Sequence, residues 1–222
     1  MFDAEVYMNQ LCDALVSCFG DRLVYVGLQG SYMRGEATER SDIDPMVVID
    51  DLSITDLNHY RQIISTLAYP ELSCGFLCGK NELENWNPLE ICHLRHTTMD
   101  IRGELASLVP TYTEQDVRNF VKMSVNNLYH EITHRYIHAT DERNMISITG
   151  SYKGVFYIRQ NLHYLETGSF LSTKSELLRS LSGLDRDVLA TSIALGNGEE
   201  MAFHNAFTLL HGWCQSIMLR LS

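Results

Sequence analysis

Two short apolar runs with a polar loop between them constrain this chain more than any other feature of its sequence. The first run, Leu23–Leu28, suits a buried strand, and so does the second, Ile43–Ile49, which is rich in β-branched residues. A Gly-Ser pair follows the first run, and an Asp-Ile-Asp motif opens the second. The sequence therefore predicts two strands with a glycine turn and a pair of carboxylates between them.

The hydrophobic period changes near Pro110, where strands alternating with helices give way to helices alone. Helices are expected over 2–19, 55–67, 113–138, 151–166, 173–182 and 199–220, a third strand over 72–78, and a helix with a turn over 186–198. We therefore predict an α/β domain over residues 1–110 followed by an all-α helical bundle over 111–222.

Composition narrows the classes of protein that fit. The 222 residues are 45% apolar and 20% charged, which is typical of a globular chain and not of a disordered one. The 28 acidic residues outnumber the 17 basic ones, and the net charge of −11 counts against a nucleic-acid backbone as the main partner and suits a cationic small molecule. The sequence shows neither a signal peptide nor an apolar run long enough for a membrane helix. We therefore expect a cytoplasmic protein whose six cysteines are reduced and mostly buried.

The polar loop between the two apolar runs carries the chemistry. Gly30 and Ser31 follow a strand, where backbone N–H groups can hold a phosphate and a glycine lets it approach closely. Asp42 and Asp44 are two apart on a strand, so both carboxylates point to one face and need a compensating cation. Mg²⁺ fits, because it combines one or two carboxylates with substrate phosphates. This combination indicates phosphoryl or nucleotidyl transfer.

These motifs resemble a known superfamily. Residues 30–37, Gly-Ser-Tyr-Met-Arg-Gly-Glu-Ala, and residues 41–44, Ser-Asp-Ile-Asp, resemble the signature of the DNA polymerase β-like nucleotidyltransferases. Residues 152–161, 166–168 and 172–174 look like the helical domain of the streptomycin/spectinomycin adenylyltransferases, which modify aminoglycosides and give antibiotic resistance. The resemblance covers most of the chain, and it is specific in the first motif and loose in the second.

The resemblance implies an N-terminal nucleotidyltransferase domain, a mixed sheet with flanking helices, ahead of the helical bundle. It implies that Asp42 and Asp44 are catalytic and bind Mg²⁺, with two ions expected. It implies that Gly30, Ser31 and Arg34 lie at the nucleotide. The expected reaction is transfer of AMP from ATP, the expected triphosphate, to a hydroxyl of a small and cationic acceptor such as an aminoglycoside.

The same resemblance names further candidates. Lys174 falls where the adenylyltransferases have a lysine on the triphosphate, and Lys153 is a second candidate for that contact. Glu71 best matches the third carboxylate, which serves as the catalytic base. Asp100, in an apolar segment that fits a fourth strand, and Glu131, on the first helix of the helical half, are the alternatives for that role.

Two other functions stay open at this point. One is a minimal nucleotidyltransferase with a helical partner domain that modifies protein or tRNA, as in toxin–antitoxin modules. The other rests on His130-Glu131-Ile132-Thr133-His134, which matches the zinc-peptidase pattern H-E-x-x-H. The third histidine of the extended pattern is absent, since His138 comes too early, so this alternative is remote. The sequence defines neither the acceptor nor the oligomeric state.

Overall fold

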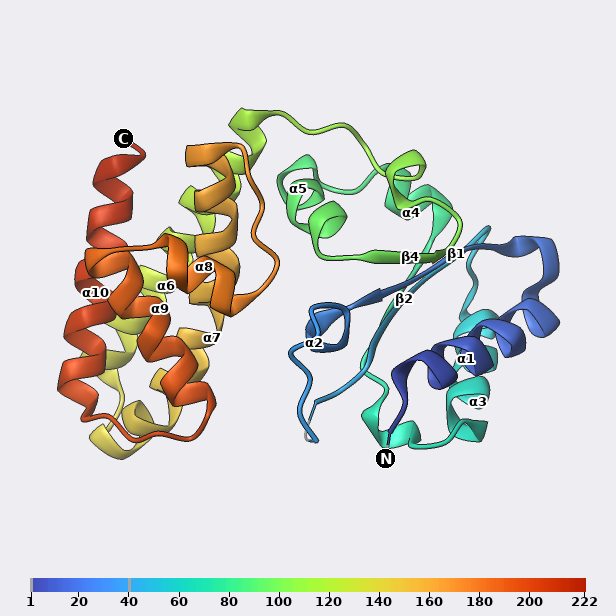
Figure 1. The fold of residues 1–222 in the computed structure, drawn as a ribbon, viewed down its shortest axis with the longest axis horizontal. Coiled ribbons are helices and arrows are strands. Elements are labelled where there is room, and N and C mark those ends of the chain that lie inside the picture. Colours follow the sequence, from blue (N-terminus) through green and yellow to red (C-terminus); the bar gives the residue numbers. More distant parts are fainter. Residues whose placement is uncertain (1, 40) are drawn as a thin grey trace. The chain divides into compact units, whose positions relative to one another are not determined.

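The computed structural model describes residues 2–39 and 41–222, and its chain divides into two compact units, Met1–Thr111 and Tyr112–Ser222. The predicted domain boundary at residue 110 lies beside this division. The first unit combines a sheet with helices, and the second consists of helices (Figure 1). The α/β plus all-α fold class is therefore confirmed.

Four strands form the sheet of the first unit. They are β1 (Leu23–Gln29), β2 (Asp44–Ile49), β3 (Phe76–Gly79) and β4 (Met99–Arg102), in the order β3-β2-β1-β4. β1 runs antiparallel to β2 and β4, while β2 and β3 are parallel, so the sheet is mixed as predicted. The third strand was predicted from residue 72, but residues 70–72 form a 3₁₀ turn and a single bridge at Ser73 precedes β3.

One face of the sheet is covered by α1 (Ala4–Phe19) and α3 (Ile54–Thr66). Side chains alternate along β2, and Val47 and Ile49 point to this face, where they join a core with Leu11. Both helices lie within two residues of their predicted ends. The helical period of the sequence thus located this layer correctly.

The opposite face carries Met46 and Val48 and is covered by shorter elements (Figure 1). These include α4 (Lys80–Glu84) and α5 (Pro88–His96), neither of which the sequence analysis predicted. Their brevity explains the failure, because five and nine residues hold too few helical turns for a clear period. This layer matters for the site, since α5 carries a histidine described below.

An ion pair joins α3 to the segment between α1 and β1. The Arg22 guanidinium donates to both carboxylate oxygens of Asp56, at 3.1 and 2.7 Å. Asp56 also accepts from the backbone N–H and the hydroxyl of Ser53, which caps α3. The Arg22 guanidinium, with help from Ser53, holds the pKa of the Asp56 carboxyl well below its usual range.

We expect Asp56→Asn to lower the melting temperature above pH 5. A depressed pKa means that the folded state prefers the ionised carboxylate, so the stabilisation is complete above the usual carboxyl pKa of about 4 and is lost as the pH falls below it. Thermal unfolding from pH 7 to pH 2 should show the difference between wild type and variant closing in acid. Asp13→Asn on the exposed face of α1 is the control. If Asp56→Asn lowered the melting temperature by the same amount at every pH, the stabilisation would not come from the ionised Asp56 carboxylate.

The second unit contains α6 (Glu114–His138), α7 (Asp141–Thr167), α8 (Lys174–Ser180), α9 (Gly183–Gly196) and α10 (Phe203–Arg220). Its main core is built by α6, α7, α9 and α10 around the fully buried Trp213. α7 begins at residue 141, ten residues before the predicted start at 151. Its glycines at 150 and 154 weakened the helical pattern, whereas the helix is capped upstream by Thr140.

All six cysteines are free thiols, and three of them are buried: Cys78, Cys92 and Cys214. Cys18 and Cys74 are exposed, so the prediction of mostly buried thiols holds for only half of them. Within residues 2–39 and 41–222, every helix is too short or too polar to cross a membrane.

Candidate active site

The turn after β1 is built around Gly30. This residue has φ +70°, a left-handed conformation that favours glycine. It also lies against Asp44, because a Cβ added at Gly30 would come within 1.8 Å of the Asp44 Oδ2 atom. Asp44 opens β2 and pairs with Gln29 at the end of β1. The antiparallel pairing of two strands therefore brings the predicted glycine turn and one of the predicted carboxylates into contact.

The two predicted metal ligands are electrostatically coupled. Asp44 is half-buried, and Asp42 is exposed two residues earlier. Burial, and then repulsion from Asp42, raise the pKa of the Asp44 carboxyl, while the positive charge of Arg34 opposes the rise. The pair therefore holds negative charge that the surrounding side chains only partly neutralise.

Arg34 follows the short helix α2 (Gly30–Met33), and its positive charge acts on the Asp44 carboxylate. Its side chain is only 7% exposed, and its Nε atom donates to Glu36 Oε2 at 3.0 Å. A buried arginine beside the Gly-Ser turn supplies fixed positive charge at the place where the resemblance puts a triphosphate. Arg34 therefore keeps its place among the candidate nucleotide-binding residues.

His93 joins this group, and the sequence analysis missed it. It lies on α5, and burial, with the positive charges of Arg34 and His96 adding to it, lowers its pKa to about 4. Its imidazole is therefore neutral at pH 7 beside Arg34. Only the packing of α5 on the sheet brings His93 here, and no local sequence motif marks it.

Glu71 lies outside the regular strands. It is exposed in the 3₁₀ turn Pro70–Leu72, three residues before the chain position that faces Asp44. That position is held by Cys74, because the Ile43–Ser73 bridge and the β2–β3 pairs share one register. An exposed thiol thus stands directly across from Asp44 on the neighbouring chain segment, with Glu71 further upstream.

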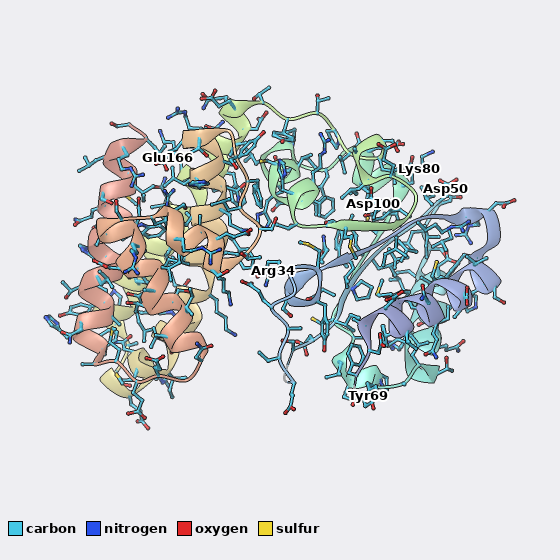
Figure 2. All side chains as sticks on the ribbon, viewed as in Figure 1. Arg34, Asp50, Tyr69, Lys80, Asp100 and Glu166 are labelled. Carbon is cyan, nitrogen blue, oxygen red and sulfur yellow. The ribbon has the colours of Figure 1, made fainter. Side chains whose placement is uncertain are left out.

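Asp100 has a structural partner. It lies on β4 (Figure 2) opposite Gly27, and the Tyr25 hydroxyl donates to its Oδ1 atom at 2.6 Å. Because β1 separates β4 from β2 and Asp44 pairs with Gln29, the backbones of Asp100 and Asp44 are two strand spacings apart across the sheet and two residues apart along it, about 12 Å in all. Asp100 therefore anchors Tyr25, and it lies away from the carboxylate pair.

Lys174 begins α8 in the second unit, directly after its N-cap Thr173. Its ammonium lies 6.0 Å from the ring centroid of Phe156, within reach of a cation–π contact. The loop before it is held by Gln160, a fully buried residue of α7 that donates to the backbone carbonyls of Leu171 and Ser172 at 2.8 and 3.2 Å. Lys174 is thus half-buried and fixed at the end of an anchored loop.

The other candidates of the second unit lie on α6 and α7. Lys153 is exposed on α7. Glu131 forms an ion pair with Arg135 at 3.2 Å and accepts from the Ser151 hydroxyl at 3.1 Å. His130, one turn before His134, is exposed on the same helix. The residue that would serve as the base of a zinc peptidase is therefore already engaged by a guanidinium.

The carboxylate pair fits Mg²⁺. It offers hard oxygen donors, and the positive charge of Arg34 only partly compensates its negative charge. Among the residues that the structure describes, no group of three His, Cys, Asp or Glu side chains is arranged to hold a metal ion. Substrate phosphates and water would thus complete the shell, as is usual for Mg²⁺.

The first unit is thus a mixed four-stranded sheet with the Gly30–Asp44 contact at one end of β1 and β2, and a helical unit follows it. No protein-family profile matches the chain, and no curated protein matches it in sequence. Among solved structures, the chain is similar to the spectinomycin adenyltransferase AAD(9) from Enterococcus faecialis, determined with ATP and spectinomycin. The two share 15% sequence identity, the match covers 99% of both chains, and the TM-score is 0.59. This likeness establishes the fold across both units.

Proposed function

We propose that this protein is a Mg²⁺-dependent nucleotidyltransferase that transfers AMP from ATP to a hydroxyl group of a small molecule. The observation that carries the proposal is the contact between the Gly30 turn and Asp44, in which a glycine turn of the kind that binds phosphate lies against a carboxylate of the kind that binds Mg²⁺. The fold shared with an adenyltransferase over 99% of both chains supports the same activity.

In this reaction the acceptor oxygen attacks the α-phosphorus of ATP, the bond from that phosphorus to the bridging oxygen breaks, and pyrophosphate leaves. Asp42 and Asp44 hold Mg²⁺, which when bound neutralises the triphosphate and acidifies the acceptor hydroxyl. The Gly30-Ser31 turn and the buried Arg34 bind the phosphate oxygens. Glu71 is our candidate for the carboxylate that takes the hydroxyl proton, with Glu131 as the alternative.

A cationic acceptor of the aminoglycoside class suits the net charge of −11. The structurally similar adenyltransferase was solved with spectinomycin, which supports a small-molecule acceptor. A role in antibiotic resistance would follow if expression of the chain raised the inhibitory concentration of such a compound.

The test is incubation with Mg²⁺, α-labelled ATP and a panel of acceptors that includes spectinomycin and streptomycin. Label transfer with pyrophosphate release supports the proposal, and omission of Mg²⁺ should stop it. Glu71→Gln should reduce transfer while ATP binding is kept, and Glu131→Gln should do so instead if that residue is the base. The absence of both ATP binding by calorimetry and transfer to any acceptor would refute the proposal.

Lys174→Gln should raise the KM for ATP about tenfold, with a smaller change in kcat. A charge-assisted hydrogen bond to a phosphate contributes about 1.5 kcal/mol, and each 1.4 kcal/mol is a factor of ten. Lys153→Gln tests the alternative lysine, and Lys122→Gln on the exposed surface of α6 is the control. Steady-state kinetics with varied ATP measures all three, and an unchanged KM in Lys174→Gln would remove that residue from the site.

A further inference from the structure

A pocket of about 520 Å³ lies in the second unit where α6 ends and α7 begins. Its walls are His130, Glu131, His134, Arg135, His138, Ala139 and Arg143. Among the side chains that the structure describes, three imidazoles and two guanidiniums thus line a single pocket together with one carboxylate. In a chain with a net charge of −11, this concentration of nitrogen donors is unusual.

Glu131, the acidic side chain in the described part of the lining, is already engaged. Glu131 Oε1 lies 3.2 Å from the Nε atom of Arg135 and accepts a hydrogen bond from the Ser151 hydroxyl at 3.1 Å. The second guanidinium, that of Arg143, comes from the first turn of α7. Counting the arginines and the glutamate among the side chains that the structure describes here, the lining carries a formal charge of +1.

The histidines form a row, because residues four apart lie on one face of a helix. The ring centroids of His130 and His134 are 6.0 Å apart with the planes nearly parallel, and those of His134 and His138 are 4.7 Å apart. All three side chains are exposed, so their N–H groups can turn toward a bound ligand. The row therefore offers several hydrogen-bond donors along one wall.

The helix dipoles do not determine whether the pocket favours a positively or a negatively charged ligand. α6 ends at His138 with its negative end, and α7 starts at residue 141 with its positive end, so the two partly offset each other. The side chains decide instead. Two guanidiniums repel a metal cation and attract an oxyanion. Each guanidinium can donate two parallel N–H hydrogen bonds to the oxyanion.

We propose that this pocket binds a multivalent oxyanion of the phosphate class. The His-x-x-x-His spacing on α6 then serves as a donor row for phosphate oxygens and not as a zinc site. The proposal does not depend on the nucleotidyltransferase activity, because its test follows anion binding alone; Glu131 is the lining residue that the proposed reaction also names.

The experiment follows the histidine ring protons by NMR while tripolyphosphate is added in EDTA at pH 7. We expect saturable shifts of the resonances of His130, His134 and His138, assigned by single His→Gln variants. Arg143→Gln should weaken binding about three- to fivefold, the scale of one exposed charge pair. Arg118→Gln, elsewhere on α6, is the matched control and should leave binding unchanged. Tripolyphosphate shifts that avoid these three histidines would overturn the proposal.

Two further measurements, with ATP and with Zn²⁺, complete the test. ATP in the same buffer distinguishes a nucleotide ligand from free oligophosphate, and binding of either supports the phosphate class. Stoichiometric Zn²⁺ that is lost in His130→Gln, together with no anion binding, would overturn the proposal.

Discussion

Replacing Asp42 and Asp44 together by asparagine should lower nucleotidyl transfer by at least about a thousandfold while the protein stays folded. Metal ions contribute several kcal/mol of transition-state stabilisation in such reactions, and each 1.4 kcal/mol is a factor of ten in rate. Asparagine keeps the size of aspartate and removes the charge that would hold Mg²⁺. The measurement is release of pyrophosphate under saturating ATP and acceptor.

The same substitution should leave the melting temperature unchanged or raise it in EDTA at pH 7. Burial and the neighbouring Asp42 raise the pKa of Asp44, so the folded state disfavours the ionised form, and ionisation there costs stability. The gain in melting temperature that Asp44→Asn contributes should therefore be present above that raised pKa. It should vanish below about pH 4, where the wild-type carboxyl is already protonated.

The exposed pair Asp50 and Asp51 at the other end of β2 gives a matched control. Asp50→Asn with Asp51→Asn removes the same charge just beyond the far end of β2 but leaves the Gly30 turn untouched. Transfer should stay within about twofold of wild type, because this change lies outside the site. An active Asp42/Asp44 variant would refute the metal assignment, and an unfolded one would move the test to the single Asp44→Asn variant.

Local sequence was enough to locate the centre of the candidate site. The apolar runs fixed β1 and β2, and a glycine that ends one strand must lie near an aspartate that opens its antiparallel neighbour. Gly30 and Asp44 were therefore predictable from residue type and order alone. The pKa rise of Asp44 comes first from its burial and second from the neighbouring Asp42, so the motif alone indicates only part of it.

Tertiary packing decided what the sequence did not reveal. His93 reaches Arg34 only because α5, a nine-residue helix with no clear period, packs on the sheet. Cys74 faces Asp44 only because the parallel pairing of β2 and β3 takes one particular register. Register depends on contacts between distant segments, so a strand predicted from residue 72 could not reveal it.

Replacing Gly30 by alanine should cut transfer about a hundredfold and lower the free energy of unfolding. The left-handed conformation costs an alanine roughly 1–2 kcal/mol, and the new Cβ would overlap the Asp44 carboxylate. That carboxylate must move, and a displacement of about 1 Å in a reacting group can cost about a hundredfold in rate. Denaturant unfolding and steady-state kinetics measure the two effects.

A control at Gly35 distinguishes the steric overlap with the Asp44 carboxylate from the cost of placing alanine in a left-handed conformation. Gly35 has φ +69°, almost the same as Gly30, but a Cβ there meets no atom within 4 Å. Gly35→Ala should therefore show the conformational cost alone and keep most of the transfer activity. In an Asp44→Ala background, where the carboxylate is gone, Gly30→Ala should cost no more stability than Gly35→Ala does. A double-mutant cycle with no coupling between positions 30 and 44 would show that the two residues do not share one site.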